Sequence, residues 1–279
     1  FKQKTAYEIM PSLVGSEMCI RDRPLGKFSE EELIPLEECI ITLTKSGYIK
    51  RLPPGVYRTQ RRGGKGVLGM KTKEEDEVAY ILSATTHDNL LFFTNRGRVY
   101  QLKVYDLPEG ERTAKGQAII NLIDIEQDEK VQSVLTAPKK KQNRYLFMAT
   151  KKGIVKKTSL DDYKTIRSSG LIAIKMAKGD ELCWTKITSG NDHVLLVTHN
   201  GKSIRFPESD VRPTGRDTMG VKGISLEKGD SVVAMETFPA KTKPPKDRRK
   251  KFFRDLLVVM KKGYGKRTCL LYTSPSPRD

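Results

Sequence analysis

The sequence has 279 residues, of which 52 are Lys or Arg and 34 are Asp or Glu, so the formal net charge is +18. This excess predicts a polyanionic partner such as a nucleic acid or an acidic membrane surface, against the alternative of a basic protein that is merely soluble. The chain contains no run of 18 apolar residues and no secretory signal, so we expect neither a membrane span nor export. The four cysteines form no C-x-x-C motif, which argues against a disulfide framework or a zinc site and indicates a reducing, cytoplasmic location.

Apolar strands followed by a polar-glycine turn and a basic strand recur along the chain. This order of strand, turn and strand is typical of a β-hairpin. It occurs at residues 40–52, 90–102, 145–157, 194–206 and 256–268. The turn glycines Gly47, Gly97, Gly153, Gly201 and Gly263 recur at intervals of roughly 50 residues, with a longer last interval. The sequence therefore predicts a repeated structural unit.

A second glycine follows each of the first four hairpins. Gly66, Gly116, Gly170 and Gly220 each come after their turn glycine at a nearly constant distance. An apolar stretch, an acidic turn and a further strand come next, so each unit offers about four strands in a period of about 50 residues. Such a period predicts an all-β, propeller-like array of four-stranded blades that bury their faces against one another. An antiparallel sandwich is the alternative, but it does not require two landmarks to keep their spacing.

Basic residues gather after the turn glycines, at corresponding places in each unit. In a closed array these positions would form a belt suited to a curved nucleic-acid backbone, while the alternative for each single residue is a solvated surface. The predicted basic rim consists of Lys50, Arg51, Arg96, Arg98, Lys151, Lys152, Lys156, Lys157, Lys202, Arg205, Lys261, Lys262, Lys266 and Arg267. No recognition helix, zinc finger or aromatic RNA-binding run is found, so we expect contact with the backbone and no base-specific recognition.

The stretch RTQRRGGKGV, residues 58–67, contains the only Gly-Gly pair of the chain. The pair occurs in one unit, so it does not belong to the blade repeat. Lys65 is followed by Gly66 and no helix is expected there, which excludes a Walker loop, and no G-x-G-x-x-G lies in a βαβ unit. Glycines permit close approach to a phosphate, and Arg61 and Arg62 can bind its oxygens with two donors each. The alternative is a flexible charged loop.

These residues resemble the C-terminal domain of the DNA gyrase A family. The resemblance runs from about residue 31 to residue 268, and the seven-residue box of the family corresponds to Gln60, Arg61, Arg62, Gly63, Gly64, Lys65 and Gly66. It implies a β-pinwheel of six blades that exchange strands with their neighbours. The family wraps double-stranded DNA around the basic rim in a right-handed sense, as part of an ATP-dependent type II topoisomerase that introduces negative supercoils. The box is tied to this wrapping.

The chain departs from the family pattern in three respects. The region with the DNA-cleaving tyrosine is absent from it, and ATP and magnesium belong to the partner subunit, so we expect this fragment to have no catalysis or cofactor of its own. We expect the cleavage domain and the ATPase subunit as partners in a heterotetramer, no membrane contact, and a location on the cytoplasmic chromosome. The blade pattern stops within a fifth unit, which predicts four blades and part of a fifth. Residues 1–24 and 269–279 match no blade and are expected to be foreign to the domain.

Two other functions remain as alternatives. The corresponding domain of topoisomerase IV is the nearest, although that relative has a degenerate box. A protein-interaction propeller is the other, and its binding would be insensitive to salt. An enzyme is the weakest interpretation, because His87, His193 and His199 are scattered and no catalytic cluster follows from spacing. The basic, proline-containing insertion at residues 241–251 is either a solvated loop or a further DNA contact.

Overall fold

The computed structural model describes residues 30–56, 76–111, 113–126, 128–137, 144–239, 255–259 and 265–269. The chain divides into two compact units, Phe1–Thr237 and Phe238–Asp279. Among the described residues the only α-helix is α2 (Glu30–Leu33), and the rest of the regular structure is β-strand and short 3-10 helix. The 3-10 helices are Pro54–Val56, Val104–Asp106, Ile119–Asn121, Leu160–Tyr163 and Glu208–Asp210. The all-β prediction is confirmed.

The first blade shows how each predicted hairpin is built. Strands β1 (Glu38–Thr44) and β2 (Tyr48–Leu52) pair antiparallel, and β3 (Val78–Thr85) pairs with the other side of β1. The turn glycine Gly47 has a φ of +84°, a value that glycine adopts without steric cost. A fourth strand, β6 (Gln117–Ala118), pairs with the free side of β2. The resulting strand order in blade 1 is β3-β1-β2-β6.

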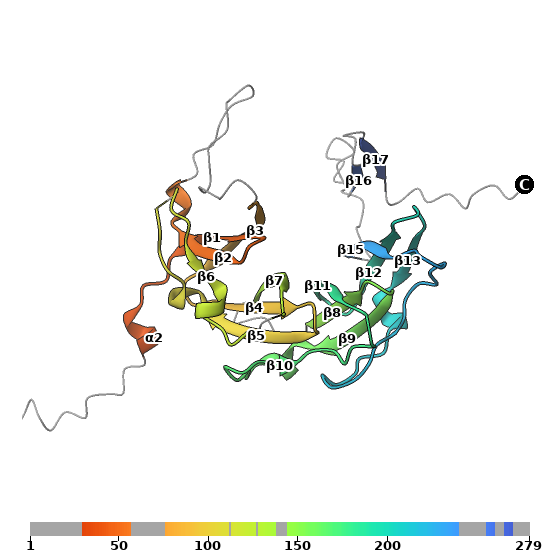
Figure 1. Cartoon of the computed structure of the whole chain (residues 1–279), viewed down its shortest axis with the longest axis horizontal. Coiled ribbons are helices and arrows are strands. Elements are labelled where there is room, and N and C mark those ends of the chain that lie inside the picture. The colour runs from red at the N-terminus through yellow and green to blue at the C-terminus, as the bar shows by residue number, and fades with distance from the viewer. Residues whose placement is uncertain are drawn as a thin grey trace, which may run out of the picture. The chain divides into compact units, whose positions relative to one another are not determined.

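The same arrangement recurs in the next sheets along the chain (Figure 1). Blade 2 has the order β10-β5-β4-β7, with β4 (Asn89–Thr94), β5 (Arg98–Lys103), β7 (Val131–Ala137) and β10 (Leu171–Ile172). Blade 3 has the order β11-β8-β9-β14, with β8 (Tyr145–Thr150), β9 (Ile154–Ser159), β11 (Leu182–Thr188) and β14 (Val221–Lys222). Blade 4 has three described strands in the order β13-β12-β15, namely β12 (Asp192–Thr198), β13 (Ser203–Pro207) and β15 (Val232–Pro239).

The second unit contains a single described hairpin, formed by β16 (Asp255–Val259) and β17 (Gly265–Cys269). The prediction of four blades and part of a fifth is thus confirmed, with a difference in blade 4, where the described residues supply three strands. Strand β17 also includes Cys269, which is paired with Asp255 and lies one residue beyond the expected end of the domain. The residues 1–24 and 241–251 lie outside the described part.

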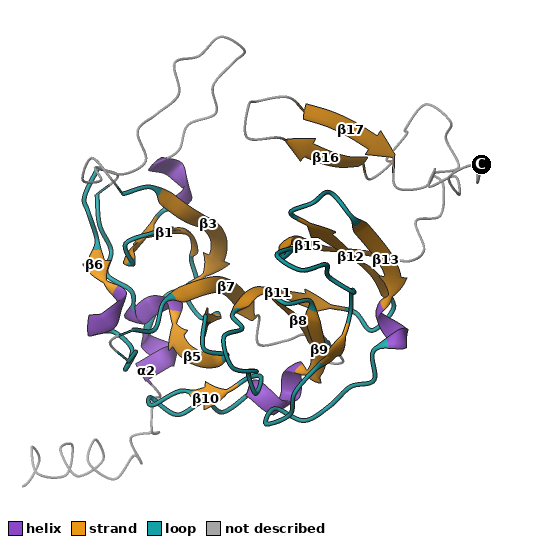
Figure 2. Ribbon diagram, turned by 45° about the vertical axis from the view of Figure 1, so that its right-hand side comes forward, coloured by secondary structure: helices purple, strands orange, loops and turns teal. Residues whose placement is uncertain are grey.

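Neighbouring blades exchange strands. Strand β6 follows β4 and β5 in the chain but pairs with β2 of blade 1. In the same way β10 pairs with β5 and β14 pairs with β9, so each of these exchange strands comes from the following unit. The sequence predicts the strands, and the family resemblance implies exchange between neighbouring blades. The structure shows that each strand joins the preceding blade. In blades 1, 2 and 3 the exchange strand occupies one edge of the sheet, and β3, β7 and β11 occupy the opposite edge (Figure 2).

The second landmark glycine permits this exchange. Gly116 precedes β6 with a φ of +78°, and a Cβ atom there would overlap the carbonyl oxygen of Ile49 on β2. Gly170, before β10, has a φ of +74°, and its Cβ would lie 2.7 Å from the ring of Tyr100 on β5. The two landmark glycines of a unit mark the hairpin turn and the crossing to the preceding blade. Their nearly constant spacing therefore reflects the length of chain between these two points.

Strand alternation places the core between the blades. On β4, Leu90 and Phe92 belong to the cluster shared with blade 1, and Leu91 and Phe93 belong to the cluster shared with blade 3. On β8, Met148 faces blade 2 while Phe147 faces blade 4. Successive side chains of a strand point to opposite faces, so an apolar run buries both faces of a blade. The predicted stacking of blades is confirmed.

Candidate nucleic-acid interface

The predicted phosphate-binding residues fall into three groups in the structure. Residues of the box, Gln60 to Gly66, lie outside the described part of the chain, as do Lys261 and Lys262. Lys266 and Arg267 are exposed on the hairpin of the second unit. The remaining predicted rim residues lie on the four blades of the first unit, and they differ in exposure and in their partners.

Cations at the hairpin turns are exposed or partly exposed, and most are neutralised locally. Arg96 and Arg98 each contact a carboxylate oxygen of Glu126 at 2.6 Å. The corresponding pair is Lys151–Glu181 at 3.5 Å in blade 3 and Lys202–Glu227 at 2.5 Å in blade 4. We call the following residues the turn cations: Lys45, Arg96, Arg98, Lys151, Lys152 and Lys202.

The acidic turns of the repeat explain this pairing. Asp180 accepts a hydrogen bond from the backbone nitrogen of Lys152, and Asp230 accepts one from that of Asn200. The aspartates thus serve as turn-forming residues, as predicted. The neighbouring glutamates have a role that was not predicted from the sequence, because they form ion pairs with the turn cations. Exposed pairs of this kind are worth at most about 1 kcal/mol, but a phosphate would have to displace them.

Arg51 and Arg205 complete the predicted positions on the hairpin strands of blades 1 and 4. The guanidinium of Arg51 donates to the carbonyl of Leu107 at 3.0 Å and lies 3.5 Å from the carboxylate of Glu109. It is therefore held against the loop that leads to β6. Arg205 is exposed on β13.

Three predicted rim residues are buried, which corrects the prediction for them. Lys50 is 0% exposed, Lys156 is 1% exposed and Lys157 is 4% exposed. Their amines donate to backbone carbonyls inside the protein, as in the bond of 3.1 Å from Lys157 to Glu208. A basic residue three or four places after a turn glycine looks like a surface cation in the sequence. The loop that carries the chain to the preceding blade covers it, so these amines cannot reach a phosphate.

Burial changes the acid–base behaviour of Lys156. Desolvation lowers the pKa of its ammonium to about 8, although the nearby carboxylates of Asp217 and Asp162 act in the opposite direction. The same neighbourhood contains Tyr163, whose phenol pKa burial raises to about 12. A lysine with a lowered pKa carries an unfavourable charge in the folded state at neutral pH, which the carbonyl hydrogen bonds offset.

This lowered pKa predicts a pH dependence of stability. Between pH 8 and pH 10.5 the unfolded chain holds more protons at Lys156 than the folded chain, so folding becomes more favourable as the pH rises. Relative to Lys156→Met, the wild type should gain up to ~3 kcal/mol across this window, since one pKa unit is worth about 1.4 kcal/mol. Urea unfolding of both proteins at pH 7.5, 9 and 10.5 measures the difference, in which the titrations of groups away from Lys156 cancel. A difference that stays constant with pH would contradict a lowered pKa.

A second set of basic residues lies on the segments that cross between blades. We define the exchange loops as residues 107–116, 164–170 and 211–220, which lead to β6, β10 and β14. Lys164, at the start of the second loop, pairs with Asp161 at 2.9 Å. No ion pair is found for the other described cations on these loops, on the exchange strands or just after them. We call these the exchange-segment cations: Lys115, Arg167, Lys175, Arg212, Arg216 and Lys222.

Two of the exchange-segment cations stand at similar distances before a landmark glycine. Arg167 precedes Gly170 by three residues, and Arg216 precedes Gly220 by four. Both lie on exchange loops, which lead to the edge strands β10 and β14. Lys115 lies with its amine 3.8 Å from the ring centroid of Tyr48, which holds a cation at this edge. The set was not predicted from the sequence, because its members share no single spacing to the landmark glycine. Arg62 of the box stands four residues before Gly66, as Arg216 does before Gly220.

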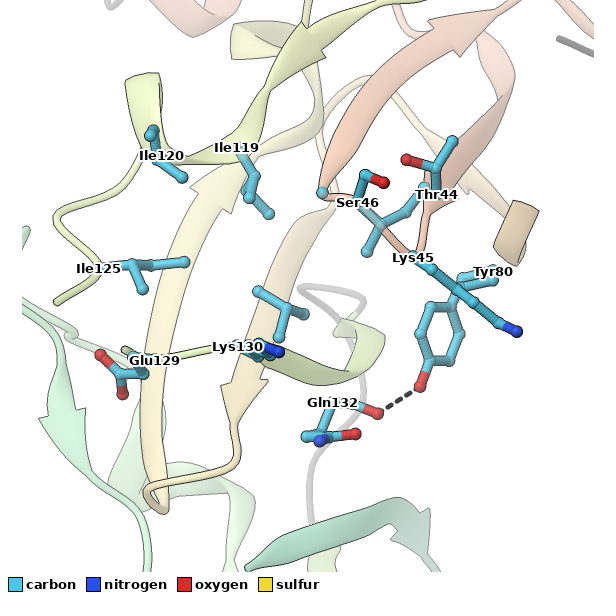
Figure 3. Close-up of a pocket in the computed structure, with 14 residues that line it drawn as sticks. Thr44, Lys45, Ser46, Tyr80, Ile119, Ile120, Ile125, Glu129, Lys130 and Gln132 are labelled. Atoms are coloured by element: carbon cyan, nitrogen blue, oxygen red, sulfur yellow. Dashed lines mark hydrogen bonds between the residues drawn. The ribbon is translucent and has the colours of Figure 1, made fainter. Parts of the chain in front are cut away.

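A hollow lies beside the hairpin turn of blade 1. This cavity of about 410 Å³ lies between the hairpin turn of blade 1, β3 and residues 119–132. Figure 3 shows its wall, where Tyr80 donates to the carbonyl of Gln132. The carboxylate of Glu129 at its edge already accepts from the hydroxyls of Thr94 and Tyr100. The groups in it thus serve structural hydrogen bonds.

Titratable groups elsewhere show no catalytic cluster among the described residues. No group of three or more His, Cys, Asp or Glu could hold a metal ion in this part of the chain. His87 bonds the carbonyl of Ile34 at 2.8 Å, on a different blade from His193 and His199. Burial raises the thiol pKa of Cys183 to about 11, which makes it a poor nucleophile at neutral pH. Within the described residues, no helix has the length and apolar character needed to cross a bilayer.

Comparison with known proteins matches the same repeats. A family model described as "DNA gyrase C-terminal domain, beta-propeller" matches residues 40–85, 88–138, 144–188 and 192–239. The chain is 42% identical over 275 residues to the DNA gyrase A protein of Staphylococcus aureus (strain NCTC 8325 / PS 47), which covers 94% of this chain and 30% of the relative. The chain therefore spans about 30% of the length of the curated relatives it matches.

Solved structures with the same arrangement are also similar. The C-terminal domain of DNA topoisomerase IV has a TM-score of 0.67 and 31% identity, covering 85% of this chain and 69% of that domain. The DNA gyrase A C-terminal domain has a TM-score of 0.66 and 29% identity, covering 84% of this chain and 72% of that domain.

Proposed function

Because the chain belongs to the family of DNA gyrase C-terminal domains, we propose that it binds double-stranded DNA and bends it along the exchange-segment cations. The observation that carries the proposal is the recurrence of cations on the exchange segments that complete blades 1, 2 and 3, which form no ion pair among the described residues. A repeated charge at a sheet edge matches a repeated phosphate backbone. The turn cations, most of which pair with glutamates, contribute less.

The binding would be electrostatic and independent of base sequence. Arginine guanidinium groups bind phosphate oxygens with two donors, and lysine adds a point charge. Blades that follow one another would present these groups to successive parts of a duplex, which favours a curved path. Bending a duplex of 20–30 base pairs costs about 1–6 kcal/mol, and the phosphate contacts must offset this cost.

In the whole protein this domain would wrap DNA for a topoisomerase reaction. We place it at the C-terminal end of a gyrase A protein that also carries a DNA-cleaving domain. The partner subunit would supply ATP hydrolysis with magnesium, and the heterotetramer would introduce negative supercoils into chromosomal DNA. This domain would position the DNA for that reaction and would not itself make or break a bond.

A second candidate is the corresponding domain of topoisomerase IV. In structure the chain is as similar to the solved C-terminal domain of topoisomerase IV, with a TM-score of 0.67, as to that of gyrase A, with a TM-score of 0.66. The fold therefore favours the two candidates equally. The 42% identity to a gyrase A protein and the complete box from Gln60 to Gly66 favour gyrase.

We expect the chain to change the linking number of DNA that is closed around it. Nicked circular plasmid is ligated with and without saturating protein, the protein is removed, and the topoisomers are separated on agarose gels. A right-handed wrap should shift the distribution towards positive supercoils. Replacement of the seven box residues by alanine should reduce the shift while the β-sheet circular dichroism is unchanged. An unshifted distribution with the wild-type chain would refute wrapping, and an equal shift with the variant would refute the role of the box.

A further inference from the structure

The ammonium of Lys156 joins two successive blade crossings inside the protein. It donates to the carbonyl of Ala173 at 2.8 Å, in the segment that follows exchange strand β10. It also donates to the carbonyls of Arg216 and Thr218, at 3.1 Å for Thr218, in the exchange loop that leads to β14. The three donors of a lysine ammonium are thus all used by main-chain oxygens.

The same contact is found in blade 1. The register pairs Leu43 with Ile49 and Ala149 with Val155, so Lys50 and Lys156 occupy equivalent positions one residue further on. The amine of Lys50 donates to the carbonyls of Glu111 and Ala114 at 3.1 and 2.9 Å. These carbonyls belong to the exchange loop of residues 107–116. Blade 2 has Tyr100 at this position, and its hydroxyl donates to Glu129.

Each of these loops carries exchange-segment cations next to the carbonyls that the buried amines bind. Ala114 directly precedes Lys115, and Arg216 itself supplies one of the three acceptors of Lys156. The backbone of the second loop is further tied by the amide of Thr214, which donates to the carbonyl of Lys157 at 2.9 Å. The amide of Lys175 donates to the carbonyl of Thr218 at 3.1 Å. Fixing the carbonyl of Arg216 fixes where its side chain leaves the loop.

We propose that Lys156 is a positioning residue, whose buried ammonium holds the exchange loop of residues 211–220 in the shape that presents Arg212 and Arg216 to DNA. The proposal rests on the proposed DNA binding and extends it to a residue that cannot touch DNA. Lys50 has the same role for Lys115. A cation is used here because a neutral amine has two N–H donors and leaves one of the three carbonyls without a partner. An uncompensated buried carbonyl would favour another loop conformation.

The test replaces Lys156 with methionine, which keeps a long unbranched side chain and removes the donors. We expect the amides of Thr214 and Lys175 to exchange with deuterium about 10-fold faster, because the loop opens without global unfolding. In duplex-DNA titrations at several salt concentrations, the slope of log affinity against log salt should become shallower by about 2, for two lost phosphate contacts. Lys228→Met is the matched control, since it removes an exposed lysine outside the exchange segments and should leave amide exchange unchanged.

The outcomes separate this proposal from the proposed function. If the wild-type chain does not bind duplex DNA, DNA binding is wrong, and the amide exchange still tests whether Lys156 holds the loop. If the wild type binds DNA and Lys156→Met changes neither exchange nor salt slope, the positioning role is wrong. Faster exchange with an unchanged slope also overturns it, because the loop would then be held without presenting the arginines.

A third measurement covers a variant that fails to fold. In the 15N-labelled wild type at neutral pH, ammonium protons of Lys156 and Lys50 should exchange slowly with water and give resolved lysine side-chain signals. Ammonium groups that all exchange at the rate of exposed lysines would contradict the buried contacts and overturn the proposal.

Discussion

The affinity of the chain for duplex DNA should fall about 10³-fold between 50 and 200 mM salt, because about six phosphate contacts release their counterions. Replacing all six exchange-segment cations by glutamine should make the slope of log affinity against log salt shallower by about 5. Fluorescence anisotropy of a labelled duplex of fixed length, measured at five salt concentrations, gives both slopes. This is the largest effect we expect on binding.

The matched control replaces the six turn cations by glutamine and removes the same formal charge. These cations already have acidic or carbonyl partners on the protein, so their loss should change the slope by ~1 or less. If the two variants change the slope equally, net charge governs binding and the exchange segments have no special place. If the control has the larger effect, DNA follows the hairpin turns, as the sequence alone predicts. Salt-insensitive binding of the wild type would instead favour a protein-interaction propeller.

Replacing Gly116 with alanine should destabilise the first unit by ~3 kcal/mol. The left-handed backbone costs a residue with a Cβ about 1–2 kcal/mol, and forcing an atom into a packed site adds about 1–3 kcal/mol. The site is packed because the new Cβ would overlap the carbonyl oxygen of Ile49, to which the exchange strand must come close. Thermal unfolding followed by circular dichroism should show a midpoint lower by about 6–12 °C, from the usual 2–4 °C per kcal/mol in a chain of this size.

Gly201→Ala separates the two contributions. Gly201 has a φ of +85°, close to the +78° of Gly116, but a Cβ there meets no atom within 4 Å. Its substitution should therefore cost only the backbone contribution of about 1–2 kcal/mol. Equal destabilisation by the two substitutions would show that close approach of the exchange strand to β2 is not what requires glycine at position 116.

Strand exchange connects the stability of the array with the proposed binding surface. Each exchange segment completes the preceding sheet and carries exchange-segment cations. A weakened crossing would therefore lower both stability and DNA affinity, whereas the loss of a surface arginine would lower affinity alone. The Gly116 and exchange-segment variants can be compared on this basis in the same two assays.

The repeat, the hairpins and the landmark glycines were predictable from the sequence, because they depend on local rules. A polar-glycine turn between two apolar strands specifies a hairpin, and its recurrence with a period of about 50 residues specifies blades. Gly47 and Gly116 were found in this way, and both have the positive φ that such a position requires. The box was found from its residues and the family resemblance.

The tertiary structure alone decided which cations face solvent. Lys157 and Arg205 each stand four residues after a turn glycine. Lys157 is nevertheless buried, with its amine bonded to the carbonyl of Glu208, whereas Arg205 is exposed on β13. Whether a side chain is covered depends on a segment far along the chain, which crosses back to the preceding blade. A local sequence pattern does not tell whether a lysine is buried, because the segment that covers it is brought there by strand exchange. The sequence by itself determined where the blades and their charges lie along the chain, and the crossing between blades determined which charges remain for a partner.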